Sequence, residues 1–444
     1  MRFLAIALVG FGLSACSARA STGGGTDGGA QDMALVDAGT IGIDRVQLDY
    51  GLPDLGIVDP CSVDGGAEVT FEPRPEFNNW YFGYGAGISF QTGAPVALHD
   101  GILMTAEGVA TISDHSGHLL FYTDGQTIWN RMHVPMENGM GLLGHISATQ
   151  SGVIVPVPGS DKEFFVFTIG AEENNGGAAY SVVDMDLAAG FGAVTSIKNV
   201  PMTTRTAEKL VAGRHRNNID YWIVTHDVDS NCFRTWLATA DGVDLEHPVV
   251  SCTGAFVSEA FWSTPGQMKM DRTGKLIAAA YVSLRDGAPG TVSNQGAVEL
   301  YDFDDETGVV SNARVVIAGN QPYGVEFSPA GTRLYATLLP PVALYQVDLC
   351  AADPASTAHA ISMPASSHNS FQSLQVGPDS RIYMTTTPAG GGLGRALSVI
   401  THPDRLDVAA GVELDSVSLD GEFSNYGLPN FIQFYARPDD IILY

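Results

Sequence analysis

Polar side chains of the kinds that bind ligands stand at the starts of strand-like segments that recur along this chain. If they converge, their carboxylates, amides, amines and phenol could hold a polar ligand. Three carboxylates and an amide of the set could also coordinate calcium in a hydrolase or lyase, namely Glu107, Glu208, Glu326 and Asn430. Lys269 and Glu326 could instead form an internal ion pair that only supports the fold. The candidate ligand-binding residues are Glu107, Gln150, Glu208, Lys209, Lys269, Tyr323, Glu326, Gln375 and Asn430.

Motifs for other chemistry are missing or incomplete in the sequence. There is no G-x-S-x-G motif of a serine hydrolase, and no C-x-x-C spacing for zinc or haem. The segment TDGQTIW is an incomplete match to the Asp-box turn of sialidases. Four histidines lack HExxH spacing and a cysteine partner, so we interpret them as loop or core residues: His115, His118, His215 and His226. We therefore predict no catalytic residue and no metal site.

Two further segments admit both a functional and a structural interpretation. The acidic stretch from Asp302 to Gly308 could bind calcium weakly, but it is explained more simply as a hairpin turn. The aromatic run Trp80, Tyr81, Phe82 and Tyr84 could form a sugar platform, but packing between sheets explains it better. We predict no cofactor, and calcium is kept as the alternative.

The elements that position these residues follow from an internal repeat. The segments YGVEFSPAGTRLYAT, FQSLQVGPDSRIYMT and GQMKMDRTGKLIAAA share one pattern of strand, tight turn and strand. One apolar marker in each first strand gives the series Ala110, Ile154, Val211, Met268, Val325, Leu374 and Phe431, spaced by 44, 57, 57, 57, 49 and 57 residues. A β-repeat of about fifty residues is typical of a β-propeller. We predict an all-β, seven-bladed propeller.

Ring closure is the second structural prediction. The last marker lies in FIQFY, Phe431 to Tyr435, with almost no chain left after it. The strand-like stretch from Asn79 to Phe90 belongs to no other repeat. We therefore expect these two segments to pair and close the ring, which would leave no free sheet edge. In such a ring the candidate polar residues would gather at the mouth of the central channel.

The N-terminus has the pattern of an export signal. MRFLAIALVGFGLSACS contains one arginine and an apolar run that is too short to span a bilayer as a helix. Leu13-Ser14-Ala15-Cys16 resembles the lipobox of bacterial lipoproteins, which implies cleavage before Cys16 and lipidation of this residue. An ordinary signal peptide is the alternative. Ser17, in place of aspartate, favours the outer membrane by analogy with enterobacterial sorting.

The chain thus divides into three predicted parts. Residues 1–15 are the signal peptide, residues 16–75 are a Gly-rich acidic tether without sustained periodicity, and residues 76–444 are the propeller. The formal charge of −27 argues against a nucleic-acid partner. We expect a location in the cell envelope, on the periplasmic or the surface face of the outer membrane.

Four cysteines follow Cys16, and an oxidising compartment allows disulfides. Cys232 and Cys252 flank a segment whose midpoint is Gly242 in an Ala-Asp-Gly turn, so folding a hairpin there brings the two residues opposite each other. Cys61 and Cys350 would then form the second pair. Free buried thiols are the alternative.

Several blocks resemble a known propeller region. They include EGVATISDHSGHLLFYTDGQTIWNR, EKLVAGRHRNNIDYWIVTH, VELYDFDDETGVVSN, YGVEFSPAGTRLYA and GLPNFIQFY. Together, from Asn78 to Tyr435, they are similar to the propeller of secreted and gliding-motility-associated Bacteroidetes proteins, a relative of YVTN and WD-type propellers. The resemblance implies a seven-bladed propeller at the cell surface and no particular activity. The sequence shows none of the large C-terminal sorting regions of those proteins, which favours an anchored receptor or structural lipoprotein.

The combined prediction is a lipid-anchored module that binds a protein or a glycan through its channel mouth without catalysis. One alternative is a hydrolase or lyase that uses the mouth carboxylates, with or without calcium. The other is a purely structural surface lipoprotein.

Overall fold

The computed structural model describes residues 61, 70–71, 74–171, 176–258, 263–284, 295–339, 342–363, 368–432 and 441–442. All of them belong to the second of two compact units, Asp54–Tyr444, the first being Met1–Pro53. The predicted signal peptide, Cys16 and most of the predicted tether lie outside the described residues. Within the described ranges the fold is all-β, and the helices are short 3₁₀ turns: η2 (Pro75–Phe77), η4 (Ala188–Gly190), η5 (Pro354–Thr357) and η6 (Asp407–Ala410). The same ranges contain no helix with the length and apolar character needed to cross a membrane.

The strands form antiparallel sheets in chain order. The first sheet holds β2 (Asn79–Phe82), β3 (Ala86–Ser89) and β4 (Val96–Leu98). A nine-stranded sheet holds β5 (Ala110–Ser113), β6 (Leu119–Thr123), β7 (Thr127–Asn130), β8 (Pro135–Met140), β9 (Gly152–Pro156), β10 (Glu163–Ile169), β11 (Ala178–Asp184), β12 (Ala193–Val194) and β13 (Val200–Thr203). A five-stranded sheet holds β14 (Leu210–Arg214), β15 (Tyr221–His226), β16 (Ser230–Thr239), β17 (Gly242–Val243) and β18 (Val249–Val257).

Three four-stranded sheets complete the series. They are β19 (Met268–Met270), β20 (Leu276–Tyr281), β21 (Ala297–Phe303) and β22 (Val310–Ala318); β23 (Gln321–Phe327), β24 (Arg333–Leu339), β25 (Ala343–Asp348) and β26 (His359–Ala360); and β27 (His368–Val376), β28 (Ile382–Pro388), β29 (Ala396–Ile400) and β30 (Val412–Ser418). In the nine-stranded sheet, two antiparallel groups meet through one parallel register pair between β8 and β12. The short strands β1 (Thr70–Phe71) and β31 (Ile441–Ile442) pair with each other.

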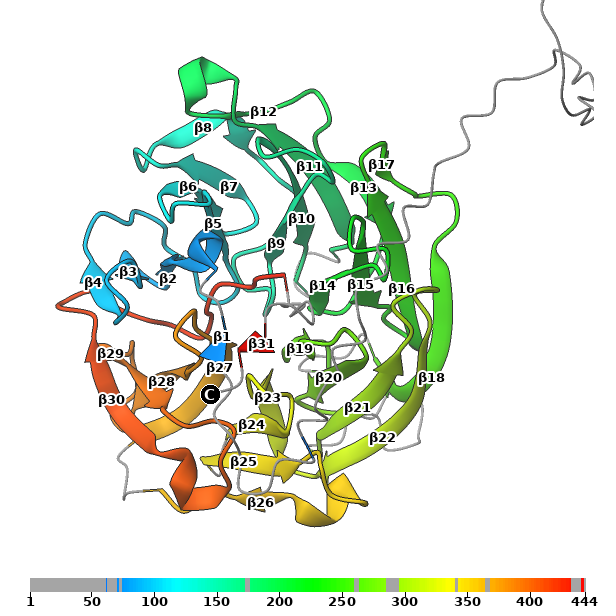
Figure 1. Ribbon diagram of the computed structural model, residues 1–444, viewed down its shortest axis with the longest axis vertical. Coiled ribbons are helices and arrows are strands. Elements are labelled where there is room, and N and C mark those ends of the chain that lie inside the picture. The colour runs from blue at the N-terminus through cyan, green and yellow to red at the C-terminus, as the bar shows by residue number, and fades with distance from the viewer. Residues whose placement is uncertain are drawn as a thin grey trace, which may run out of the picture. The chain divides into compact units, whose positions relative to one another are not determined.

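The sheets of this unit stand around a common centre, like the blades of a propeller (Figure 1). Strands β5, β9, β14, β19, β23 and β27 lie near the centre, and strands such as β22, β26 and β30 lie at the rim. The sequence markers Ala110, Ile154, Val211, Met268, Val325 and Leu374 all fall in these central strands, β5, β9, β14, β19, β23 and β27, and all are buried. The repeat therefore predicted the central strands correctly.

The unit YGVEFSPAGTRLYAT becomes the hairpin of β23 and β24. Its turn closes through a hydrogen bond of 2.8 Å from the Gly331 amide to the Ser328 carbonyl, and Gly331 has φ of +71°. A left-handed conformation of this kind is readily accessible only to glycine. Alternating residues such as Val325 and Phe327 then point into one core cluster, which they share with Ala278 of the preceding sheet. The core thus lies between neighbouring sheets.

The ring closes by packing of the last sheet against the first. Tyr383 of β28 and Val399 of β29 belong to the same core cluster as Trp80 and Ile88. The ring of Trp80 lies 5.4 Å from that of Tyr383, measured between centroids. Burial of aromatic and aliphatic surface between these sheets takes the place of a hydrogen-bonded ladder at this position.

The predicted pairing of Phe431 to Tyr435 with Asn79 to Phe90 is not observed among the described residues. Phe431 does approach the first sheet, with its ring 5.8 Å from that of Trp80, but it lies outside any strand. Pro429, two residues before it, forms a parallel bridge with Val109, whose carbonyl accepts from the Asn430 backbone amide, and Asn430 Nδ2 donates to carbonyls of β9 and β14. Residues 433–435 of the predicted strand lie outside the described part.

Two disulfides are present, and they join the same pairs of cysteines that the sequence suggests. Cys232 and Cys252 are bonded and stand opposite each other in the register of β16 and β18. Cys61 and Cys350 form the other bond, across 289 residues of chain. The hairpin argument therefore identified the first pair, and the second was the remaining combination.

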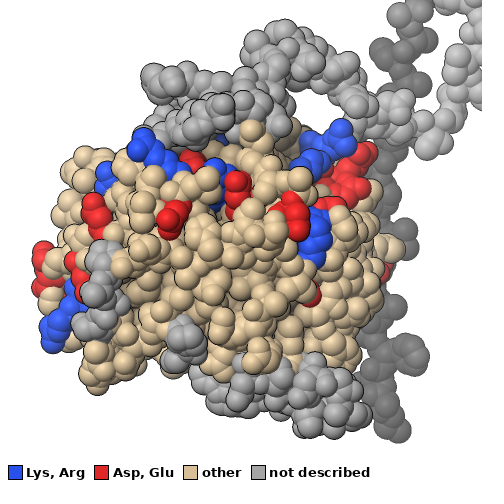
Figure 2. Space-filling model, turned by 90° about the horizontal axis from the view of Figure 1, so that it is seen from below, with Lys and Arg blue, Asp and Glu red and all other residues tan. Residues whose placement is uncertain are grey.

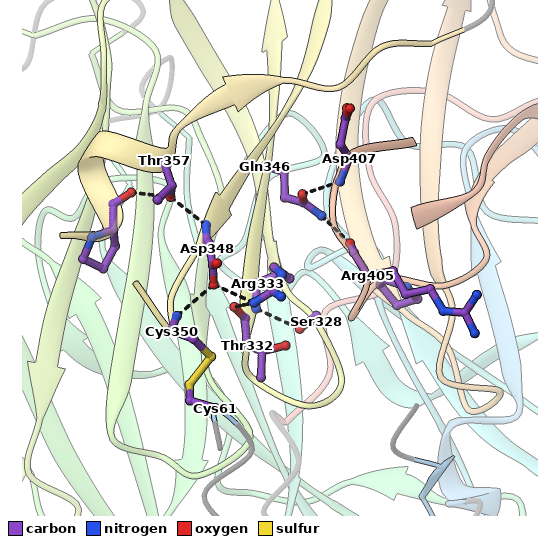
Figure 3. A network of polar contacts seen from close by, with 12 residues as sticks. Cys61, Ser328, Thr332, Arg333, Gln346, Asp348, Cys350, Thr357, Arg405 and Asp407 are labelled. Atoms are coloured by element: carbon purple, nitrogen blue, oxygen red, sulfur yellow. Dashed lines mark hydrogen bonds and ion pairs between the residues drawn. A yellow bond between two sulfur atoms is a disulfide. The ribbon is translucent and has the colours of Figure 1, made fainter. Parts of the chain in front are cut away.

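A polar network surrounds the Cys61–Cys350 bond (Figure 3). The amide of Cys350 donates to Asp348 Oδ1 over 3.0 Å, and Arg333 Nη1 lies 2.6 Å from the same oxygen. The Asp348 amide donates in turn to Thr357 Oγ1. The disulfide therefore holds Cys61 just beyond the end of β25, a position that the network stabilises.

Candidate functional site

Eight of the nine candidate polar residues lie in or just before the central strands, and Asn430 lies outside any strand. All are buried except Glu107, which is half-buried. They form three groups of contacts in the middle of the ring. One group centres on Gln150 and Asn430, one on Lys269 and Glu326, and one on the residues around Tyr323.

Gln150 and Asn430 tie three central strands together. Gln150 Oε1 accepts hydrogen bonds from the amides of Leu210 (3.3 Å) and Met268 (2.9 Å), and its Nε2 donates to the Met268 carbonyl and to Asn430 Oδ1. Asn430 Nδ2 donates to the carbonyls of Leu210 (2.9 Å) and Gly152 (3.3 Å). These buried amides satisfy backbone groups of β9, β14 and β19 that would otherwise be unpaired, which is a structural role.

Lys269 and Glu326 form the ion pair that the structural interpretation predicts. Their Nζ and Oε2 atoms are 3.2 Å apart and both side chains are 1% exposed. Lys269 Nζ also donates to Gln375 Oε1, and Glu326 Oε2 accepts from the Val376 amide over 3.2 Å. Burial lowers the pKa of Lys269 and raises the pKa of Glu326, and each partner's charge opposes the shift of the other.

The third group lies where the chain enters the central strands. Tyr323 Oη donates to Glu107 Oε2 over 3.0 Å, and burial raises the pKa of Tyr323 well above its usual value, so the phenol keeps its proton. The amide and hydroxyl of Thr149 both donate to Glu208 Oε2, each over 3.0 Å. Each carboxylate therefore has a donor from within the protein.

Lys209 is fully buried in the same region. Its Nζ donates to the carbonyls of Thr264, Pro265 and Gly266, each 3.0 Å away, and lies 4.9 Å from the centre of the Tyr281 ring. Burial lowers the pKa of Lys209 to about 7. Three carbonyl acceptors match the three N–H groups of an ammonium, so the amine supports a loop between sheets.

The proposed calcium ligands are not assembled as one set. Glu326 contacts Lys269, whereas Glu107 and Glu208 accept from Tyr323 and Thr149. In the part of the chain that the structure describes, no three His, Cys, Asp or Glu side chains are placed to hold a metal ion. In the acidic segment, Asp302 and Phe303 end β21, and a turn follows in which Asp304 Oδ1 accepts from the amides of Glu306 and Thr307.

The aromatic run of the first sheet is packing surface, as the structural interpretation expects. Trp80, Tyr81 and Phe82 are buried, and Trp80 Nε1 donates to the Phe77 carbonyl over 2.9 Å. Tyr81 stacks on Tyr122 with ring centres 4.7 Å apart. These faces are covered by protein and do not form an open sugar platform.

The four histidines have separate surroundings. His226 is buried at the end of β15, and His118 and His215 lie in turns, where His118 contacts Asp114 over 3.3 Å. His115 differs from the other three because it lines a pocket that the sequence did not predict.

This pocket lies at the opposite end of the central strands from the predicted mouth. It has a volume of about 520 Å³, which is within the range of small-molecule sites. The turns that leave β5, β9 and β14 line it, together with η2 and Ile432. In the sequence these turns are DHSG, PGSDK and HRNNID, whose Asp, Gly and Asn residues signal only a turn.

One wall of the pocket carries a histidine between two carboxylates. His115 Nδ1 is 2.6 Å from Glu76 Oε1, and its Nε2 is 3.5 Å from Asp161 Oδ1. The hydrogen bond with Glu76 raises the pKa of His115, so protonation is favoured to a higher pH than for a free histidine. Arg214, at the end of β14, lies on another wall with its guanidinium 5.9 Å from the centre of the Tyr221 ring.

Charge is unevenly spread over the side of the molecule that carries β26. On this side, Lys and Arg lie among Asp and Glu towards one edge, and most of the visible face is uncharged (Figure 2). Mixed signs agree with the exposed ion pairs found elsewhere on the chain, such as Arg216 with Glu306. The net charge of −27 therefore does not make this side uniformly acidic.

Comparisons with known proteins do not identify the chain. No protein-family model matches it, and no curated relative is found. Loosely similar solved structures include hydrazine synthase of Kuenenia stuttgartiensis (11% identity, 76% of this chain, 96% of that chain, TM-score 0.45). Another is a hypothetical selenium-binding protein of Sulfolobus tokodaii (10% identity, 83% of this chain, 92% of that chain, TM-score 0.44). A third is the Pan2 WD40 domain of Neurospora crassa (13% identity, 73% of this chain, 87% of that chain, TM-score 0.38). With TM-scores below 0.5, these likenesses carry no argument about function.

Proposed function

We propose that this chain is a lipid-anchored, seven-bladed β-propeller of the cell envelope that binds a ligand without catalysis. The seven blades are β2–β4, β5–β8, β9–β13, β14–β18, β19–β22, β23–β26 and β27–β30. In this proposal the ligand binds in the pocket where the central strands end, and the buried polar residues of the channel support the blades.

The observation that carries the proposal is the contrast between the two ends of the central strands. At the predicted mouth, the polar side chains bond with one another and with backbone groups of adjacent sheets. At the other end, an open pocket of about 520 Å³ combines apolar and charged walls. An open site of mixed polarity is typical of ligand binding, whereas a closed polar network is typical of support.

The binding proposal predicts that filling the pocket abolishes ligand capture. Ile219 lines the pocket and is 60% exposed, so Ile219→Trp should occupy its space without disturbing the core. Envelope small molecules and glycans that co-purify with the full chain, identified by mass spectrometry, should disappear from this variant. The matched control is Val408→Trp in η6, which is 65% exposed and outside the pocket. Equal ligand loads in the wild type and in Ile219→Trp would refute the pocket as the binding site.

The anchoring proposal rests on the lipobox-like sequence that ends in Cys16. Two or more acyl chains give stable membrane anchoring, whereas one gives only weak anchoring. The mature N-terminal fragment should therefore begin at Cys16 and carry the mass of a diacylglyceryl group and an acyl chain. Cys16→Ala should move the protein from the membrane fraction to the soluble fraction. An unmodified N-terminus in membrane-derived protein would contradict the proposal.

A further inference from the structure

The pocket offers an apolar wall of considerable extent. Its apolar lining residues include Phe77, Ile112, Leu120, Val157, Phe164 and Ile219. Burying apolar surface of a ligand against such a wall is favourable by about 25 cal/mol per Å². The wall therefore fits the hydrocarbon or aromatic body of a small molecule.

Arg214 is the charged group of the pocket that has no acidic partner. Within the described residues no carboxylate pairs with it, and it only approaches the Tyr221 ring. Six other arginines pair with acids: Arg205 with Asp229, Arg216 with Glu306, Arg234 with Asp227, Arg314 with Asp302, Arg333 with Asp348, and Arg381 with Asp379. In a chain with 49 acidic and 22 basic residues, an unpaired guanidinium at a pocket wall is available for an anion.

Each acidic group of the pocket has at least one partner within the protein. Glu76 and Asp161 contact His115, and Asp114 Oδ1 accepts from the amides of Ser116 and His118. The second oxygen of Glu76 is buried and has no hydrogen-bond partner among the described residues. The raised pKa of His115 favours a positive charge between the two carboxylates, and this charge offsets their repulsion of an anion.

We propose that the pocket binds an amphipathic acid, with its carboxylate on Arg214 and its apolar body against the apolar wall. This inference rests on the proposed binding function and names the chemical class of the ligand. A planar carboxylate can accept two hydrogen bonds from the guanidinium fork, which an alcohol cannot. The negative charges of the rest of the chain act weakly at the site, since physiological salt screens charges beyond about 8 Å.

The test uses three probes with one apolar body: naphthalene-2-carboxylate, 2-naphthalenemethanol and 2-naphthalenemethylamine. Calorimetric titration of the full chain should give an affinity for the acid on the order of tenfold to a hundredfold above that for the alcohol, since hydrogen bonds to charged groups are the stronger ones. The amine should bind more weakly than the alcohol. Arg214→Gln should abolish the preference for the acid, and Arg214→Lys should retain part of it.

Arg205→Gln is the matched control, because Arg205 is paired with Asp229 and lies outside the pocket. It should leave the preference for the acid unchanged. Arg214→Gln should also keep the melting temperature of the wild type, which separates loss of binding from loss of fold. Equal affinity for acid and alcohol, or an unchanged preference in Arg214→Gln, would overturn the ligand class but leave the binding function standing. If none of the three probes binds, the ligand class is also wrong. The binding function would still stand, because the envelope-ligand test with Ile219→Trp does not depend on these probes.

Discussion

Replacing Lys269 with methionine is expected to lower the free energy of unfolding by about 3–5 kcal/mol, because it leaves Glu326 as an uncompensated buried charge. Both side chains are 1% exposed, so water cannot replace the lost partner. Gln375 Oε1 also loses its donor. Urea or guanidinium unfolding of the full chain, followed by tryptophan fluorescence, measures the change.

The double variant Lys269→Met with Glu326→Leu should recover most of this loss, since apolar side chains can replace a buried ion pair at little cost. The control is the exposed pair of Lys162 and Asp186, whose side chains are 61% and 62% exposed. Lys162→Met should leave the free energy of unfolding nearly unchanged, because exposed ion pairs contribute little. Unchanged stability in Lys269→Met would contradict the supporting role and favour a ligand-binding role for this channel group.

The central strands could be predicted from sequence because each is defined locally. Alternating apolar residues and a tight turn, as around Gly331, specify a hairpin without reference to the rest of the chain. The polar residues of the channel could be placed for the same reason, since each stands at a fixed point relative to a first strand. Contacts between these polar residues could be expected because the central strands that carry them are neighbours. The contact of Lys269 with Glu326 follows from equivalent positions in consecutive repeats.

The pocket could not be predicted in this way. Its walls come from turns of three different repeats, from η2 and from Ile432, so no single stretch of sequence contains its pattern. His115, Asp161 and Arg214 each look like an ordinary turn or strand-end residue. Their convergence depends on how far each strand extends before it turns, and local propensities do not specify this distance to within one residue.

In the C-terminal segment, the local sequence pattern predicts a strand that the described residues do not form. FIQFY alternates like a strand, but tertiary contacts override this preference for its first residues. Phe431 packs on Phe77 with ring centres 4.7 Å apart, and Asn430 binds carbonyls of β9 and β14. Hydrogen bonds and aromatic packing across sheets thus decide the conformation at a position where the local pattern favours a ladder.

Acid is expected to destabilise this protein through His226, a buried residue that the proposed function does not use. Its Nδ1 lies 2.8 Å from the Asp227 carbonyl, and the charge of Lys209 opposes its protonation. The rings of Phe233 and Tyr281 lie 4.6 and 5.8 Å away and help to exclude water from the imidazole. Burial accordingly lowers the pKa of His226 to about 3.

The direction of the effect follows from proton linkage. Between about pH 6.5, the ordinary histidine value, and pH 3, the unfolded chain binds a proton at this site and the folded chain does not. Stability therefore falls as the pH falls through this window, by about 1.4 kcal/mol per unit, or about 3 kcal/mol between pH 6.5 and pH 4. The free energy of unfolding of the wild type and of His226→Phe is measured by denaturant titration at several pH values. Between pH 6.5 and pH 4, the variant should lose about 3 kcal/mol less stability than the wild type. Phe233→Leu, a neighbouring change without a titrating group, should lower stability at every pH and keep the wild-type slope. Parallel slopes for the wild type and His226→Phe would mean that the folded protein protonates His226 as easily as the unfolded chain does.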